Sequence, residues 1–160
     1  MDEARAKSYA VWLLSQQART EKQIREKLLK KDVSEEDLPE VMEALRRWGY
    51  LDDAGLAARW IESRGKTRGR RALAFELRQK GVDNDTAREA LSERTDDAET
   101  EACLLAARRK VGTRTLDSSR EAQAKLSSFL ARRGFGWDAI RPTLKTIYAT
   151  DPDDLDDAED

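Results

Sequence analysis

The segment LRQKGVDNDTA, residues 77–87, has two counterparts in the chain: LLKKDVSEEDL at residues 28–38 and LARRGFGWDAI at residues 130–140. The three copies begin 49 and 53 residues apart and align without a gap. Each contains a leucine, then a cation, a turn residue, an apolar residue and the start of a new amphipathic pattern. A period near 50 residues is typical of a repeated unit of about three helices. The sequence therefore predicts an all-α protein of three tandem three-helix repeats, stacked as an elongated, curved, solenoid-like rod.

Helical periodicity extends over almost the whole chain and predicts about nine helices, separated by short breaks that contain Gly, Asp or Ser. The first repeat is expected over residues 1–52 and the second, with a basic segment, over residues 53–94. The third is expected over residues 95–149, and residues 150–160 are expected to be an acidic, disordered tail.

Capping residues refine these helix boundaries. Helices are expected to start after Thr20, Ser34 and Ser118, each of which is followed three residues later by Gln or an acidic residue, as in a capping box. Asp52 and Asp53 are expected to cap the fourth helix. Gly81 is expected to end the fifth helix in a left-handed conformation.

The composition excludes several classes of protein. The chain has no histidine and a single cysteine, Cys103, so it lacks the usual general base and cannot form an internal disulfide or complete a zinc site. It contains no apolar run of about 18 residues and no apparent secretory cleavage site. We expect a cytoplasmic protein without enzymatic activity, with no catalytic residues, cofactor, bound metal or membrane association.

Charge is distributed unevenly along the chain. The total is −2, but DPDDLDDAED at residues 151–160 holds seven acidic residues and no basic one, so the rest of the chain is at +5. The segment SRGKTRGRRALAFELRQKGV, residues 63–82, holds seven Lys or Arg residues and one acidic residue, Glu76. We expect the acidic tail either to screen the basic surface or simply to increase solubility.

Comparison of the repeats predicts which side chains of the basic segment are exposed. Phe75 aligns with Glu26 and Ser128, so its position is expected to face solvent, and Arg71 and Arg78 share its side of a helix. An exposed aromatic residue between two arginines is typical of a binding surface. The alternative is that the cations are a solvated face and that Phe75 packs on the adjoining repeat. The candidate partner- or DNA-binding residues are Arg64, Lys66, Arg68, Arg70, Arg71, Phe75, Arg78 and Lys80.

Other positions are expected to be structural. The aligned pairs Ile24 and Leu28, Leu73 and Leu77, and Leu126 and Leu130 are predicted core residues. Gly65, Thr67 and Gly69 are expected to form a flexible hinge that presents the cations. Packing between repeats is assigned to Trp48, Tyr50, Leu51 and Trp60, and Trp12 is expected at the place of Trp60 in the first repeat.

The central segment GYLDDAGLAARWIESRGKTRGRRALAFELRQKGV, residues 49–82, resembles the RecX family of regulators of the bacterial RecA recombinase. RTEKQIREKLLKK and KLSSFLARRGFGWDAI are similar to the first and third units of that family. The resemblance covers residues 4–148 and leaves out the acidic tail. Two departures are Leu56, where phenylalanine is common, and Arg70, where proline is frequent.

The resemblance implies a function in recombinational DNA repair and the SOS response. RecX-like proteins lie in the groove of the RecA–DNA filament and inhibit strand exchange and filament-coupled ATP hydrolysis. A monomer that binds the filament, in contact with RecA and with DNA directly or within the filament, is therefore the leading hypothesis. The alternative is a sequence-nonspecific DNA-binding protein that uses the same basic face.

Overall fold

The computed structural model describes residues 1–149, which form nine α-helices and no β-strand. The predicted tail at residues 150–160 lies outside this range. The all-α, tandem-repeat prediction is confirmed. The helices are α1 (Glu3–Gln16), α2 (Glu21–Leu29), α3 (Leu38–Arg47), α4 (Asp53–Arg64), α5 (Arg70–Lys80), α6 (Asn84–Ser92), α7 (Asp96–Val111), α8 (Arg120–Arg132) and α9 (Trp137–Tyr148).

The three copies of the repeated segment form the same helix ending. The turn residue has a positive φ in each copy: 58° at Asp32, 96° at Gly81 and 91° at Gly134. In each copy the next residue donates its N–H to a leucine carbonyl five residues back, Val33 to Leu28 at 3.2 Å, Val82 to Leu77 at 3.0 Å and Phe135 to Leu130 at 3.2 Å. This bond is the signature of the Schellman motif. All six of these donor and acceptor residues are buried, so the repeat is a structural unit and the ending predicted at Gly81 is confirmed.

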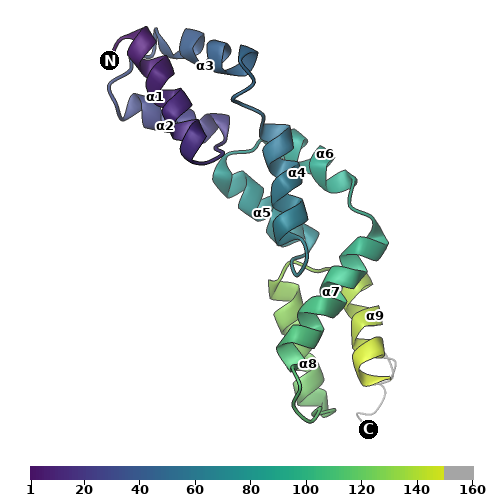
Figure 1. The fold of residues 1–160 in the computed structure, drawn as a ribbon. Coiled ribbons are helices and arrows are strands. Elements are labelled where there is room, and N and C mark those ends of the chain that lie inside the picture. Colours follow the sequence, from purple (N-terminus) through teal and green to yellow (C-terminus); the bar gives the residue numbers. More distant parts are fainter. Residues whose placement is uncertain (150–160) are drawn as a thin grey trace. The chain divides into compact units, whose positions relative to one another are not determined.

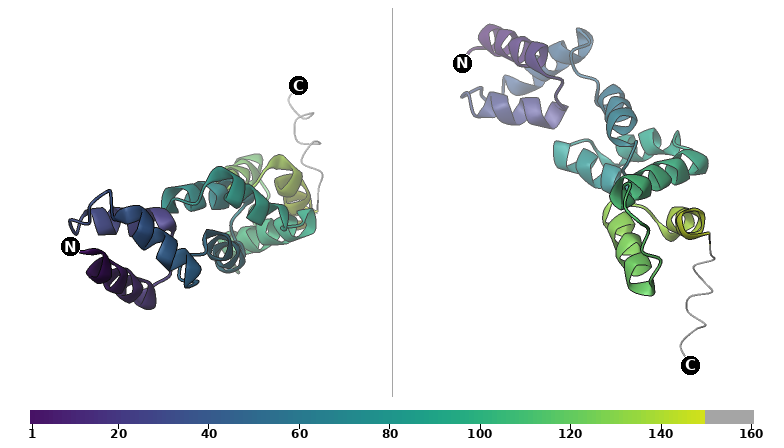
Figure 2. Two further views of the ribbon diagram at one scale, coloured as in Figure 1. Left: turned by 90° about the horizontal axis from the view of Figure 1, so that it is seen from above. Right: turned by 60° about the horizontal axis from the view of Figure 1, so that its bottom comes forward.

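The described chain divides into two compact units. One comprises residues 1–59 and 76–90, and the other comprises residues 60–75 and those from 91 onward. In the first unit, α1, α2 and α3 pack together around a core that includes Ile24, Leu28 and Leu45 (Figure 1). In the second unit, α7, α8 and α9 surround a core that includes Cys103, Leu130 and Phe135 (Figure 2). The six leucine and isoleucine positions predicted to be core are all buried.

The predicted helix starts are partly right. Thr20 and Gln23 form the expected capping box, and Asp52 accepts a hydrogen bond from the Gly55 N–H at 3.0 Å at the start of α4. Ser34 accepts from the Asp37 N–H at 3.1 Å, but α3 begins only at Leu38, because Pro39 fits best in a first turn. The cap of α8 is Ser119 rather than Ser118, since its side chain accepts the Ala122 N–H.

The expected role of Asp53 is wrong. Its carboxylate accepts the Glu21 N–H at 3.1 Å, so it caps α2 rather than its own helix. Burial raises the pKa of this carboxyl above its ordinary value. The contact joins residues 32 positions apart, and for this reason no local capping pattern predicts it.

Several aromatic side chains lie outside the core. Trp48 is 53% exposed and Tyr50 is 45% exposed, so the expectation that they seal contacts between repeats is wrong. The helix pattern that placed Trp48 on the apolar side ends with α3 at Arg47. Trp12 is also exposed and stacks on Tyr9, because the buried stripe of α1 consists of Ala6, Ala10 and Leu13. Leu51 is buried, as expected.

Candidate partner-binding surface

The loop between α4 and α5 is fixed by backbone contacts. The Gly69 N–H donates to the Arg133 carbonyl at 2.8 Å, and the Arg71 N–H donates to the Gly134 carbonyl at 3.2 Å. A Cβ on Gly69 would lie 2.3 Å from the Gly134 oxygen, and one on Gly65 would lie 2.2 Å from the Ile61 oxygen. These glycines permit close backbone approach. The expectation that they form a flexible hinge is therefore wrong.

A buried ion pair holds the end of this loop that leads into α5. Arg94 Nε lies 2.6 Å from Glu99 Oε2, and both side chains are only 7% exposed. The other Glu99 oxygen accepts the Arg70 N–H at 2.9 Å, while Arg94 Nη2 donates to the Arg68 carbonyl at 2.9 Å. A buried pair persists only when its remaining hydrogen-bonding groups are also satisfied, and here the backbone of the basic segment supplies the partners. Arg94 and Glu99 thus position that segment.

Arg70 differs from the other cations of the basic segment. Its guanidinium donates to Asp96 Oδ1 at 3.0 Å and to the Arg94 carbonyl at 2.6 Å. Together with its N–H, it attaches the start of α5 to the start of α7. Proline, frequent at this position in the RecX pattern, has no N–H to give Glu99. The structure therefore gives this departure from the pattern a role in packing.

The remaining candidate residues fall into two groups. Arg64, Lys66, Arg71, Phe75 and Arg78 are exposed, whereas Arg68 and Lys80 are half-buried. The Arg64 guanidinium carbon lies 4.8 Å from the centre of the half-buried Trp60 ring, a cation–π contact that restricts both side chains.

Arg71, Phe75 and Arg78 lie at i, i+4 and i+7 on α5, so they share one side of this helix; we call them the α5 face. Phe75 is 57% exposed, which confirms the exposure predicted from the repeat. The Arg71 and Arg78 side chains have no ion-pair partner within residues 1–149. The α5 face therefore presents an apolar ring between two unpaired guanidinium groups.

The described residues show no arrangement suited to metal binding. Within residues 1–149, no three Cys, Asp or Glu side chains are placed to hold an ion. Cys103 is fully buried, and burial raises the pKa of its thiol to about 11, which disfavours the reactive thiolate. None of the helices in residues 1–149 combines the length and apolar character of a membrane span.

Sequence reasoning did not identify Arg94 or Glu99. Both lie in the mostly acidic stretch ERTDDAETE, residues 93–101, whose composition is typical of a solvated helix start. Their backbone partners in the basic segment are 26 and 29 residues away, and no pattern in the sequence marks such a contact. Their burial is visible only in the structure.

The fold defines an all-helical protein of tandem three-helix domains, and its α5 helix presents a basic, partly aromatic face to solvent. Family models described as the first, second and third three-helix domains of RecX match residues 6–45, 52–91 and 97–144. A regulatory protein RecX from Amycolatopsis mediterranei (strain U-32) is 33% identical over 160 residues, covering 96% of this chain and 91% of the relative. The chain belongs to the RecX family.

Two further relatives extend the comparison. A regulatory protein RecX from Clostridium botulinum (strain Eklund 17B / Type B) is 30% identical over 85% of this chain, which spans 65% of the length of that relative. The crystal structure of RecX from Lactobacillus salivarius matches with a TM-score of 0.83 and 26% identity, over 92% of this chain and 97% of the other. Both similarities cover most of the helical part of the chain.

Proposed function

We propose that the chain regulates a RecA recombinase by binding the RecA–DNA filament, and that it thereby inhibits strand exchange and filament-coupled ATP hydrolysis. It acts as a cytoplasmic monomer and catalyses no reaction itself. The observation that carries this proposal is the exposed α5 face in the middle domain. Its support is the membership of a family whose relatives are named regulatory protein RecX.

The chemistry of the α5 face suits a filament. Arginine forms bidentate hydrogen bonds with carboxylates and phosphates, both of which a protein–DNA filament presents. An aromatic ring at the centre of an interface contributes apolar contact, and the surrounding polar groups set the register. Arg64 and Lys66 precede this face in the chain and are also exposed, so they add to the same positive field.

Co-sedimentation with preassembled RecA–single-stranded DNA filaments, followed by an ATPase titration, tests the proposal. Reversing Arg71 and Arg78 to Glu is expected to leave helicity unchanged and to abolish both binding and inhibition. The matched control reverses Arg5 and Arg88, which make only exposed i,i+3 pairs on α1 and α6 and change the net charge equally. Inhibition that persists in the Arg71 and Arg78 variant would show that the contact surface lies elsewhere on the chain.

The exposure of Phe75 next to cations also favours a second candidate, a sequence-nonspecific DNA-binding protein in which the ring stacks on bases. Neutralising about five phosphates of single-stranded DNA predicts a slope near −3.5 for log affinity against log salt. A mixed protein interface depends less steeply on salt. Tight binding to bare DNA at physiological salt, unimproved by RecA, would favour the second candidate.

A further inference from the structure

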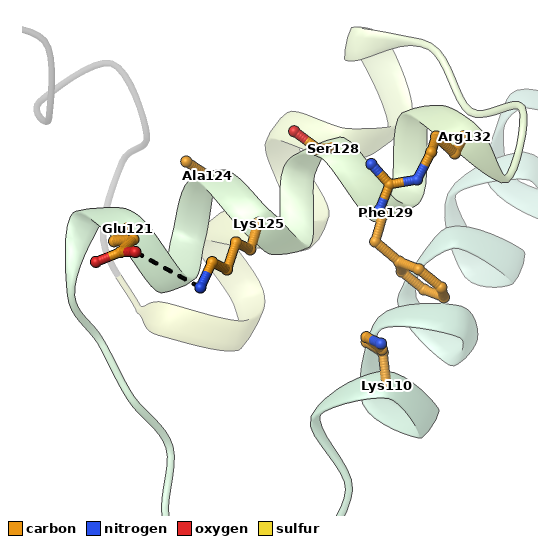
Figure 3. A pocket seen from close by; sticks show the side chains of 7 residues that line it. All are labelled: Lys110, Glu121, Ala124, Lys125, Ser128, Phe129 and Arg132. Carbon is orange, nitrogen blue, oxygen red and sulfur yellow. Dashed lines mark ion pairs between the residues drawn. The ribbon is translucent and has the colours of Figure 1, made fainter.

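A second basic surface lies in the third domain, apart from the α5 face. It is a hollow of about 490 Å³ along α8 and the end of α7 (Figure 3). We call it the α8 hollow. It is lined by Lys110, Glu121, Ala124, Lys125, Ser128, Phe129 and Arg132.

The α8 hollow combines an aromatic ring with an excess of positive charge. Lys110 Nζ lies 5.0 Å from the centre of the Phe129 ring, and the guanidinium carbon of Arg133 lies 5.3 Å from it. Among the described residues that line the hollow, Glu121 is the only carboxylate, and it lies 3.5 Å from Lys125 Nζ. Three cations against one carboxylate leave the hollow positive, and it therefore favours an anionic ligand.

The repeat relates this hollow to the proposed binding surface. The interval of 53 residues places Ala124 at the position of Arg71 and Ser128 at the position of Phe75. The α8 hollow thus occupies, on the middle helix of the third domain, the side that α5 uses in the middle domain. An occupant of the hollow would cover the counterpart of the α5 face.

We propose that the chain's own acidic segment, residues 151–160, binds in the α8 hollow. Its sequence DPDDLDDAED carries seven acidic residues and one large apolar residue, Leu155, which has two aspartates on each side. Leu155 against Phe129, with the flanking aspartates on Lys110, Lys125 and Arg132, matches apolar to apolar groups and anions to cations. The segment competes there with other polyanions, and this inference holds whether or not the chain regulates a recombinase.

The start of the segment supports this assignment. It follows α9, whose last residues Ile147 and Tyr148 pack against the same core as Phe129. Leu155 lies six positions after Ala149, a reach of about 20 Å in extended form. Because α9 is about 18 Å long at 1.5 Å per residue, this reach is about the length of that helix. A short tether gives an effective concentration of about millimolar, so even a weak contact is substantially populated.

Paramagnetic relaxation enhancement in the full-length chain tests the contact directly. A nitroxide on Ala158→Cys labels one site, because Cys103 is fully buried with a thiol pKa of about 11. The amide signals of Lys125, Ser128 and Phe129 are expected to broaden at low salt and to recover at about 0.5 M salt, where the Debye length is only a few ångströms. Broadening that is absent, or equal over the whole surface, would overturn the proposal.

Charge variants test the site. Lys125→Glu with Arg132→Glu is expected to remove the broadening, and Glu121→Gln is expected to increase it, since that change deletes the only lining carboxylate. The Arg5 and Arg88 reversal is the matched control and should leave the broadening in place. Broadening that persists in the Lys125 and Arg132 variant would show that the segment does not bind the hollow.

A binding titration supplies an independent readout without RecA. A fluorescent 20-nucleotide oligo-dT is the probe, and deleting residues 151–160 is expected to raise its affinity about twofold, the factor by which an effective concentration of about 1 mM masks a site whose dissociation constant is also about 1 mM. The Lys125 and Arg132 reversal should abolish this gain. Equal affinity with and without the segment, or a gain that persists in the reversed variant, would refute competition at the hollow.

Discussion

Replacing Glu99 by alanine is expected to destabilise the second compact unit by about 3–5 kcal/mol, the range for breaking a buried ion pair by removing one partner. The loss has two sources. Arg94, only 7% exposed, keeps its charge without a carboxylate, and the Arg70 N–H loses its acceptor at 2.9 Å. The second effect alone accounts for about 1 kcal/mol or more of this total.

Cys103 provides the assay, because its buried thiol lies in the core of the same unit. The rate at which a thiol reagent modifies it measures the population of the opened state when closing is faster than reaction. A destabilisation of 3–5 kcal/mol raises that population by a factor of at least about 100. Far-UV circular dichroism in urea checks that the secondary structure of the variant is native at the start.

A second substitution separates the ion pair from general loss of packing. Changing Arg94 to Met in the Glu99→Ala variant removes the stranded cation and is expected to recover part of the lost stability. A loss of stability under 1 kcal/mol in Glu99→Ala, the value typical of an exposed pair, would contradict this prediction. So would a double variant whose loss equals the sum of the two single losses.

Three further predictions concern single contacts, each read out as the change in the free energy of unfolding. Gly134→Ala is expected to destabilise the fold by more than 1 kcal/mol, because φ is 91° and a Cβ would lie 2.3 Å from the Ala72 nitrogen. Asp32→Gly, at the equivalent turn of the first repeat, should be neutral or stabilising because φ is also positive there. A larger loss of stability for Asp32→Gly than for Gly134→Ala would contradict the equivalence of the two turns. Hydrogen bonds from Arg46 lower the pKa of Glu21 below its ordinary value near 4.5, so the pair stabilises the fold above that pH and the gain is lost as pH falls through the lowered pKa. Glu21→Gln should reduce the loss of stability between neutral and acidic pH by up to about 1 kcal/mol, a small value because both side chains are partly exposed. An unchanged dependence of stability on pH would count against a contribution from this pair. Arg70→Pro is expected to keep α5, because proline is tolerated at a first helical position, but to cost about 1–3 kcal/mol through the orphaned Glu99 acceptor.

The repeat made a large part of the fold predictable. A Schellman ending depends on a few neighbouring residues, so three copies at matching positions predict three similar turns. The same alignment predicted burial of Leu73 and Leu77 and exposure of Phe75, because one copy reports what the environment of another tolerates. The inference fails where the helix does not continue, as at Trp48.

Long-range polar contacts were not predictable in this way. Asp53 caps α2 from 32 residues away, and Glu99 accepts the Arg70 N–H from 29 residues away. Each of these residues occupies an acidic helix start, where an exposed role satisfies every local rule. Only the packing of helices distant in sequence decides which carboxylate is buried, and neither periodicity nor charge pattern encodes that choice.

Because long-range contacts are not visible in the sequence, the number of cations in the basic segment does not show which of them are exposed. The basic segment looks uniform in sequence, yet Arg70 is engaged by Asp96 and Arg94, whereas Arg71, its neighbour, is exposed and unpaired within residues 1–149. Adjacent residues on a helix point about 100° apart, so one turns toward α7 and the other toward solvent. The buried carboxylate of Glu99 accepts the N–H of Arg70, at which α5 begins, and the Gly134 carbonyl accepts the N–H of Arg71. The start of the helix that carries the α5 face is thus held in part by a residue that is itself buried and carries the opposite charge.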